Sequence, residues 1–261
     1  MKYALVTGAS KGIGKAIALE LAKRNHPLLL IARSEDLLEA LAREIRDSFH
    51  VEVHCKAVDL TTATSANELV EWCESNQYHV DILVNNAGFG LWGAFGDLPL
   101  DGQLEMMNLN MTSLVAITHS FLPLLSKSDR SYILNVASIA SFLAIPHFSI
   151  YAATKAFVLS FSRSLRFDIA EQGIKVSCLC PGATESEFLE RAGMEAIGEK
   201  ASGVYMSAEA VAKIGVSGML RGKAEIVPGL VNKIATTGIW AAPRSIMESI
   251  AGSIYRKRTS S

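Results

Sequence analysis

The fold is decided by the stretch Thr7-Gly8-Ala9-Ser10-Lys11-Gly12-Ile13-Gly14. It follows directly on the apolar run Tyr3 to Thr7 and leads into apolar residues at helical spacing from Lys15 to Ala22. A glycine-rich turn between a strand and a helix places the helix N-terminus, which favours negative charge, where a phosphate can bind. The stretch therefore predicts a dinucleotide-binding loop, and an ordinary strand-to-helix turn is the alternative when it is taken alone.

The three glycines of this loop have different expected uses. Gly8 permits a tight turn, Gly12 lets the backbone approach a pyrophosphate, and Gly14 lets the helix pack closely on the strand. Their spacing is G-x-x-x-G-x-G, a variant of the G-x-G-x-x-G fingerprint. The residues expected to contact the cofactor here are Gly8, Ser10, Lys11, Gly12, Ile13 and Gly14.

Seven short apolar runs, separated by longer amphipathic stretches, set the fold class. The runs are Tyr3 to Thr7, Pro27 to Ala32, Val51 to Val58, Val80 to Asn85, Ser131 to Ala137, Ile174 to Cys180 and Ala224 to Val227. Near-continuous apolar strands are typical of parallel sheets covered by helices on both faces. The pattern predicts an α/β protein with a single-domain Rossmann fold, a doubly wound seven-stranded parallel sheet whose ligands bind at the carboxyl ends of the strands.

The length of 261 residues suits one such domain, and no internal repeat or linker divides the chain. We expect the domain to span 1–261, with 186–203 as a substrate flap and 229–261 as a C-terminal extension. This extension carries scattered large apolar residues and ends in Arg256-Lys257-Arg258. A weak peripheral membrane contact is one interpretation of it, and a solvated tail is the other.

Composition excludes several classes of partner. The net charge of -1 provides no field for nucleic acid, and no uncharged apolar run reaches the length of about 18 residues that spans a bilayer. The N-terminus leaves no room for a signal segment, and the four cysteines show no C-x-x-C spacing, so we expect reduced thiols, a cytoplasmic location and no metal site. Cys178 and Cys180 fall in an apolar run and are expected to be buried.

Arg33-Ser34, at the end of the second apolar run, bears on the choice of cofactor. An acidic residue there would accept hydrogen bonds from the ribose of NAD, whereas Arg33 can pair with a 2′-phosphate, and Lys11 adds positive charge on the same side. NADP(H) is therefore expected over NAD. The alternatives are that both cations are solvated, or that Glu35 and Asp36 serve a ribose diol.

Asp59-Leu60 follows the third run in the same way. Asp59 is expected to accept the adenine amino group, and a helix N-cap is the alternative because two threonines follow it.

Tyr151-Ala152-Ala153-Thr154-Lys155 places a phenol and an ammonium on one helix face. An unperturbed tyrosine has a pKa of ~10, so acid/base work requires a shift of ~3 units, about 4 kcal/mol in favour of phenolate. Lys155 and a positively charged nicotinamide are the expected sources of that shift. Ser138, at the end of the fifth run, could hydrogen-bond a substrate oxygen. A Tyr and a Lys at this spacing are common by chance, so the catalytic interpretation depends on their occurring together with Ser138 and the other motifs.

Together these motifs resemble the classical short-chain dehydrogenase/reductase family, in the same order over nearly the whole chain. They are the Thr7 to Gly14 loop, Asn85-Asn86-Ala87-Gly88, Asn110, Ser138, Tyr151-x-x-x-Lys155 and Pro181-Gly182. The resemblance implies that Tyr151 exchanges the proton, that Lys155 lowers its pKa and holds the nicotinamide ribose, and that Ser138 orients the carbonyl. It also implies that Asn110 holds a water linking Lys155 to solvent, with Asn108 as its rival.

The same resemblance implies the rest of the cofactor site. Asn86, Ala87 and Gly88 would lie against the cofactor, with Asn85 tying neighbouring strands together, and Pro181 and Gly182 would lie beside the nicotinamide. Either Thr184 or Ser186 would contact the carboxamide. Helices around Asn110 and Tyr151 would form the contacts of a homodimer or homotetramer.

The loops expected around the substrate are apolar and aromatic. Their large residues are Phe89, Leu91, Trp92, Phe95, Phe142, Leu143 and Phe148, with His147 expected in the wall or on the surface. They indicate a lipophilic small molecule, keto/acyl or steroid-like, and loop core or an oligomer contact is the alternative. The expected function is NADP(H)-dependent interconversion of a carbonyl and a secondary alcohol.

Two rival functions use the same fold. A redox-inert NADP(H)-binding sensor or scaffold would more often have lost Tyr151 or Lys155, which are both present. An epimerase or dehydratase would usually carry a large added C-terminal domain.

Overall fold

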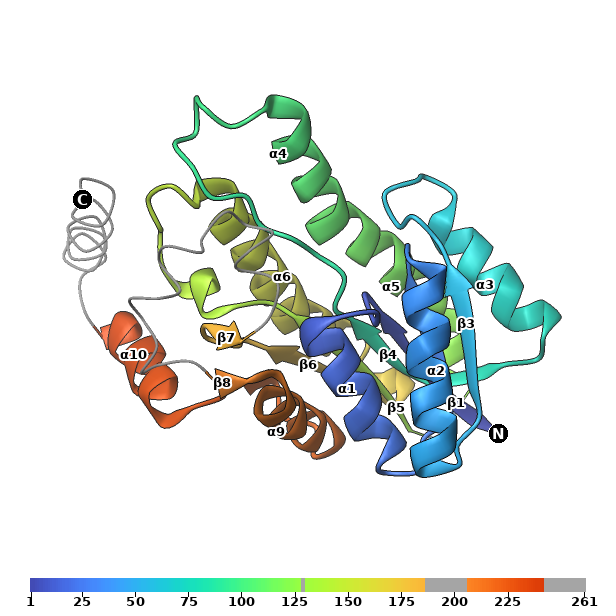
Figure 1. The fold of residues 1–261 in the computed structure, drawn as a ribbon. Coiled ribbons are helices and arrows are strands. Elements are labelled where there is room, and N and C mark those ends of the chain that lie inside the picture. Colours follow the sequence, from blue (N-terminus) through green and yellow to red (C-terminus); the bar gives the residue numbers. More distant parts are fainter. Residues whose placement is uncertain (128–129, 186–205, 242–261) are drawn as a thin grey trace.

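The seven apolar runs form one parallel sheet in the order β3-β2-β1-β4-β5-β6-β9 (Figure 1). The structure is a computed structural model and describes residues 1–127, 130–185 and 206–241. The strands are β1 (Lys2–Thr7), β2 (Leu28–Ala32), β3 (Val53–Ala57), β4 (His79–Asn85), β5 (Ser131–Val136), β6 (Ile174–Leu179) and β9 (Glu225–Ile226). The predicted fold class is confirmed, because every pair of neighbours in this sheet runs parallel.

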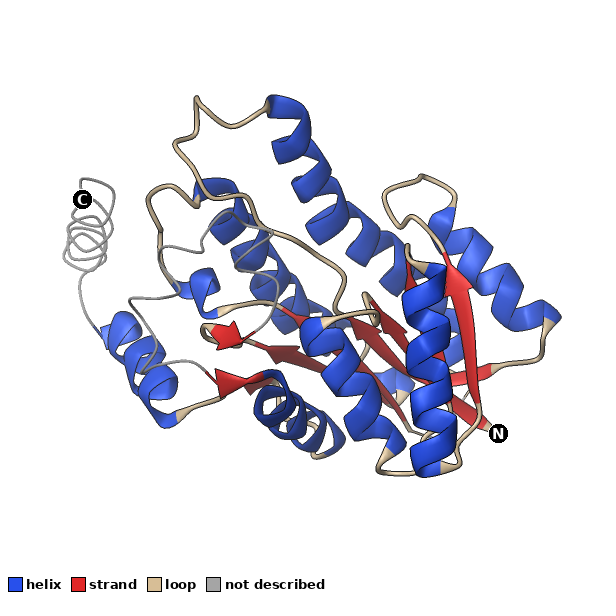
Figure 2. Ribbon diagram, viewed as in Figure 1, coloured by secondary structure: helices blue, strands red, loops and turns tan. Residues whose placement is uncertain are grey.

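Helices cover both faces of the sheet (Figure 2). They are α1 (Gly12–Ala22), α2 (Glu35–Phe49), α3 (Ser65–Ser75), α4 (Leu100–Met107), α5 (Leu114–Leu125), α6 (Ser149–Asp168), α9 (Ala208–Leu220) and α10 (Leu230–Ala241). One buried cluster joins α1, α2 and α9 to the sheet, and a second joins α3, α5 and α6 to it. The helices pack there because their apolar stripes match two apolar strand faces.

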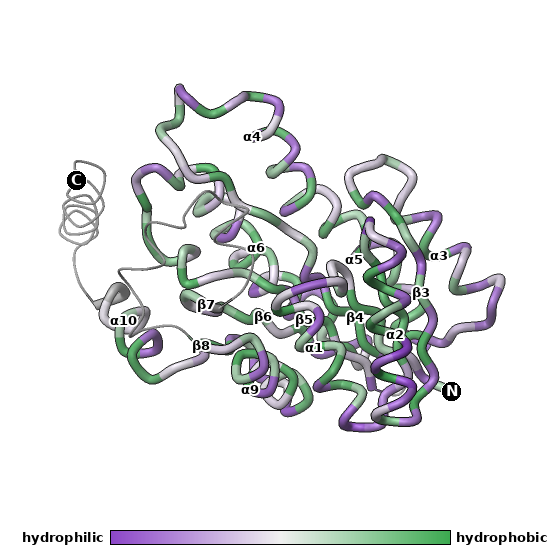
Figure 3. Tube along the Cα trace, in the orientation of Figure 1, coloured by the Kyte–Doolittle hydropathy of each residue, from purple (hydrophilic) through white to green (hydrophobic). Residues whose placement is uncertain are grey.

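Alternation along β1 shows how one strand serves both clusters. Ala4 and Val6 belong to the first cluster, whereas Tyr3 and Leu5 belong to the second. Figure 3 shows hydrophobic central strands beside an α2 in which hydrophilic and hydrophobic residues alternate along the helix. Truncating a fully buried side chain such as Leu5 to alanine would cost about 2–5 kcal/mol.

The strand order reverses direction at β1, which pairs with β2 on one side and with β4 on the other. At such a switch point the loops after the two strands diverge and leave a crevice at the carboxyl edge. The Thr7 to Gly14 loop follows β1 and the Asn86 to Gly88 loop follows β4. The fold therefore brings the two glycine-containing motifs to one place.

Three features lie beyond the sequence-based expectation. β7 (Thr184–Glu185) and β8 (Met206–Ser207) form a small separate sheet, which two-residue strands are too short to reveal by periodicity. Asn108–Ser113 is a π-helical segment between α4 and α5. The predicted flap at 186–203, with Ser186, and the end of the C-terminal extension from 242 onward lie outside the described residues.

Of the helices in the part of the chain that the structure describes, none is both long enough and apolar enough to cross a membrane.

Candidate active site

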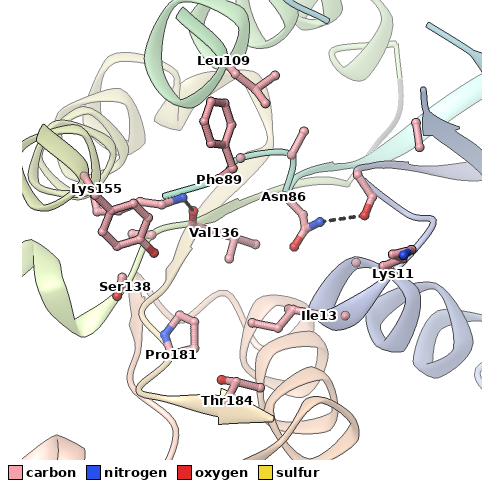
Figure 4. Close-up of a pocket in the computed structure, with 18 of the residues that line it drawn as sticks. Lys11, Ile13, Asn86, Phe89, Leu109, Val136, Ser138, Lys155, Pro181 and Thr184 are labelled. Atoms are coloured by element: carbon pink, nitrogen blue, oxygen red, sulfur yellow. Dashed lines mark hydrogen bonds between the residues drawn. The ribbon is translucent and has the colours of Figure 1, made fainter. Parts of the chain in front are cut away.

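A cavity of about 540 Å³ opens at the carboxyl edge of the sheet. In Figure 4, Lys11 and Ile13 lie on one side of it, Ser138 and Lys155 on the other, and Pro181 and Thr184 below. The predicted site residues that line it are Gly8, Ser10, Lys11, Gly12, Ile13, Gly14, Arg33, Ser34, Asp59, Leu60, Asn86, Ala87, Gly88, Ser138, Tyr151, Lys155, Pro181, Gly182 and Thr184. Asn110 is described but does not line it, and Ser186 lies outside the described residues.

The glycine loop has a shape that other residues would not adopt. Gly8 and Gly12 have φ of 64° and 55°, in the left-handed region that favours glycine. A Cβ on Gly14 would lie 2.2 Å from the Gly8 carbonyl oxygen. A side chain at Gly14 would therefore clash first with the loop itself, whereas the sequence analysis expected this glycine to allow the helix to pack on the strand.

Thr7 and Asn86 join this loop to the end of β4. The Asn86 amide nitrogen Nδ2 donates to the carbonyls of Thr7 and Gly8 at 3.0 and 3.1 Å, and the Thr7 hydroxyl accepts from the backbone of Asn86 and Ala87. The sequence analysis assigned no role to Thr7, because its partners follow another strand and no local pattern indicates the contact. The expected tying role of Asn85 is confirmed, since its Nδ2 donates to side chains on α5 and β5.

Charged residues gather at the end of the cavity formed by the loops after β2 and β3. The Arg33 side chain is about half exposed, and its guanidinium lies 3.8 Å from the Glu105 carboxylate. Asp59 accepts hydrogen bonds from the backbone and hydroxyl of Thr61, and these bonds hold the pKa of Asp59 below its usual value. The N-cap interpretation of Asp59 is wrong, because α3 begins at Ser65 with Thr64 as its N-cap.

Tyr151 and Lys155 are both buried, one turn apart on α6, beside the end of β5. The Ser138 side chain shares a hydrogen bond with the Tyr151 phenol and also accepts from the backbone of Ala140. The Lys155 ammonium Nζ donates to the carbonyl of Val136 at 3.0 Å and lies 5.7 Å from the Tyr151 ring centroid. The phenol oxygen, the serine hydroxyl and the ammonium therefore meet at one end of the cavity.

Burial has the largest effect on the pKa values of Tyr151 and Lys155. It raises the pKa of Tyr151 to about 12, with the Ser138 hydrogen bond acting in the opposite direction. It also lowers the pKa of Lys155 to about 8. Burial takes both charged forms out of water, so it disfavours the phenolate of Tyr151 and the ammonium of Lys155 alike.

The side chain of Asn110 serves as a structural tie. Its Oδ1 accepts from the backbone nitrogen of Phe89 at 3.1 Å, and its Nδ2 donates to the Phe89 carbonyl and the Thr154 hydroxyl. Both hydrogens of Nδ2 are used in these bonds, so the predicted water would be held by an oxygen of Asn110, such as its main-chain carbonyl in the π-helical segment. The rival Asn108 points elsewhere, donating to the carbonyl of Thr61.

The remaining wall is apolar. Of the aromatic residues expected around the substrate, Phe89, Trp92 and Phe148 line the cavity. Phe95 is 63% exposed and lies outside it. The apolar residues that line this part of the wall are Phe89, Trp92, Leu109, Ile139, Ala140, Ile145 and Phe148.

A family model described as short chain dehydrogenase matches residues 2–196, which include the glycine loop, Ser138, Tyr151 and Lys155. The chain belongs to the short-chain dehydrogenase family.

Two relatives and one solved structure of a similar protein agree with the fold of this short-chain dehydrogenase. The NADP-dependent 3-hydroxy acid dehydrogenase of Schizosaccharomyces pombe is 32% identical over 210 residues, covering 80% of this chain and 81% of the relative. The very-long-chain 3-oxoacyl-CoA reductase of Mus musculus is 35% identical over 184 residues, covering 69% of this chain and 58% of the reductase. The structure of a short-chain dehydrogenase from Sphingobium yanoikuyae in complex with NADPH has a TM-score of 0.81 and 31% identity, covering 94% of this chain and 96% of that one.

Proposed function

We propose that this short-chain dehydrogenase uses NADP(H) to interconvert a carbonyl and a secondary alcohol, with Tyr151 as the acid and base. The observation that carries the proposal is the meeting of Tyr151, Ser138 and Lys155 at one end of a cavity whose other end is the glycine loop. The NADPH bound in the Sphingobium structure and the name of the S. pombe relative support the choice of cofactor.

The cavity fits a dinucleotide of this kind. Gly12 begins α1, so the backbone N–H groups and positive end of that helix face the cavity where a pyrophosphate would lie. Arg33 and Lys11 would hold the 2′-phosphate, with Ser34 beside them, and Asp59 and Leu60 would border the adenine. Glu35 and Asp36 are not among the described residues of the cavity wall, which weakens the alternative of a ribose diol held by them.

The other half of the dinucleotide would lie between the loops after β4 and β6. Asn86, Ala87 and Gly88 would border it on one side and Pro181 and Gly182 on the other. Thr184 would contact the carboxamide, since its side chain is at the cavity wall and its hydroxyl donates to the Gly182 carbonyl at 3.0 Å. When bound, the nicotinamide supplies or accepts the hydride.

The chain's own groups would handle the proton. Ser138 and Tyr151 would both hydrogen-bond the substrate oxygen, and Tyr151 would donate its proton in reduction and accept one in oxidation. With its pKa raised to about 12, the phenol carries its proton near neutrality, as the proton donor in reduction must. Lys155 would hold the ribose, and the main-chain carbonyl of Asn110 would hold the water that returns protons from solvent.

The substrate would be lipophilic. The charged residues among the described wall are Lys11, Arg33, Asp59 and Lys155, and all of them are assigned above to the cofactor. The wall around Ser138 and Tyr151 is apolar, which favours a neutral carbonyl compound.

We also propose that residues 1–261 form a single domain and that the protein is a homodimer or homotetramer. Its proposed location is the cytoplasm. Phe157 on α6 is 40% exposed and stacks on Phe161 at 6.0 Å, so this helix presents an aromatic face that a second copy could cover. Cys55, Cys73, Cys178 and Cys180 are all free, as expected of a reducing compartment.

The test is to supply NADPH carrying deuterium at C4 with a panel of ketones, aldehydes and 3-oxoacyl thioesters. The proposal predicts NADPH oxidation and a product with deuterium on its carbinol carbon. Tight NADPH binding with no turnover of any compound would instead support the redox-inert sensor.

A further inference from the structure

Two loops from different strands meet at the apolar end of the cavity. The backbone nitrogen of Gly93, in the loop after β4, donates to the carbonyl of His147, in the loop after β5, at 2.9 Å. The Trp92 ring lies 5.8 Å from the His147 ring and 5.5 Å from the Phe148 ring. These contacts hold Trp92 and Phe148 side by side in the wall.

Phe148 also covers the phenol of Tyr151. The two rings are stacked, with centroids 4.1 Å apart and planes inclined by 22°. Phe148 is the N-cap of α6, and its carbonyl accepts from the backbone of Ala152 at 2.9 Å, so the start of the helix fixes its backbone. With only 6% of it exposed, Phe148 is a rigid part of the wall.

His147 provides the backbone geometry of this junction. Its φ of 63° is in the left-handed region, which non-glycine residues seldom adopt. Such a conformation persists only where the surrounding structure holds it in place. Here it accompanies the carbonyl contact to Gly93, which joins the loop that carries Trp92 to the loop that carries Phe148.

We propose that Trp92 and Phe148 form a specificity wall that selects ketones whose carbonyl belongs to, or adjoins, a rigid ring system, over straight-chain carbonyl compounds. The inference rests on the proposed function and names the substrate class of the same site. A ring can lie flat against neighbouring aromatic faces. A flexible chain of equal carbon number would bury less of its surface against these flat faces and would also lose more rotational freedom when ordered on them.

Two ketones of equal carbon number, 2-decalone and 2-decanone, test the wall. For the wild-type protein with NADPH, kcat/KM should be at least about tenfold higher for 2-decalone. Trp92→Ala should lower kcat/KM for 2-decalone by about tenfold or more, mainly through KM, and leave 2-decanone within about threefold. Trp92→Phe, which keeps a flat ring, should recover most of the preference.

Phe95→Ala is the matched control, because Phe95 is in the same loop, exposed and outside the cavity. This variant should leave kcat/KM unchanged for both ketones. Unchanged NADPH affinity and circular dichroism for Trp92→Ala would show that the variant is folded and loaded. Phe148→Leu is a second variant. It removes the other aromatic ring of the wall and should also reduce the preference for 2-decalone over 2-decanone.

Equal loss for both ketones in folded Trp92→Ala, or a wild-type preference for 2-decanone, would overturn the wall while leaving the proposed function intact. If NADPH reduced neither ketone nor any other carbonyl compound, the proposed function would fail and the wall with it.

Discussion

The carboxamide of Asn110 binds both backbone groups of Phe89, accepting from its nitrogen at 3.1 Å and donating to its carbonyl at 3.0 Å. The same amide nitrogen donates to the Thr154 hydroxyl at 3.1 Å, and that hydroxyl donates to the carbonyl of Tyr151 at 2.8 Å. One buried side chain thus joins the wall of the cavity to the helix that carries the proposed acid.

Replacing Asn110 with leucine should destabilise the protein strongly. Asn110→Leu leaves the backbone groups of Phe89 and the hydroxyl of Thr154 without their partner, and each unsatisfied buried group costs about 1–3 kcal/mol. We expect a loss of about 3 kcal/mol in the free energy of unfolding, measured by urea denaturation. Asn108→Leu removes one hydrogen bond and should cost about 1 kcal/mol, so equal losses would contradict the assigned role.

Reversing the charge at Arg33 should change the preference between cofactors. Arg33→Asp removes the cation proposed for the 2′-phosphate and adds a repelling carboxylate, so the Kd for NADPH should rise about a hundredfold while that for NADH changes by less than about threefold. Binding titration with both nucleotides is the measurement. Arg43→Asp, on the exposed part of α2, makes the same change in net charge away from the cavity and serves as the control. A similar loss for both nucleotides would refute the assignment.

Lys155 makes stability depend on pH. Burial lowers its pKa from 10.5 to about 8, so between these values the unfolded chain binds more protons than the folded protein, and the Lys155 contribution to stability rises with pH. The whole change is about 3 kcal/mol. Lys155→Met removes this pH dependence. The variant should therefore be more stable than the wild-type protein at pH 8, and this difference in the free energy of unfolding should shrink by about 3 kcal/mol by pH 10.5. Urea unfolding of both proteins across this window tests it, and parallel pH curves would speak against a desolvated lysine.

The sheet was predictable because its central strands, such as Leu28–Ala32, are continuous apolar runs, whereas β3 (Val53–Ala57) and β9 (Glu225–Ile226) each include a charged residue and carry a weaker signal. Ser138 and most of the proposed cofactor residues were predictable because their loops follow strand ends, which all meet at one edge. Tyr151 and Lys155 lie on α6 and were predicted from the motif that they share with the family. For these reasons almost every predicted site residue lies at one cavity.

What the sequence could not reveal depends on hydrogen bonds between distant residues. Thr7, Thr154 and the side chain of Asn110 act through partners on other elements, and no local spacing encodes them. The direction in which the pKa of Tyr151 moves in the protein alone depends on burial, which a motif does not report. The left-handed backbone of His147 was not predicted, because histidine adopts this conformation more often than most residues but too seldom for a single histidine to indicate it.

The role of Tyr151 as proton donor is tested most directly by Tyr151→Phe, with NADPH affinity and ketone turnover measured on the same preparation. The variant removes one oxygen and keeps the ring stacked on Phe148. We predict NADPH affinity within about threefold of the wild-type value and turnover lowered by about a thousandfold or more. Turnover that survived the loss of the hydroxyl would contradict the central claim.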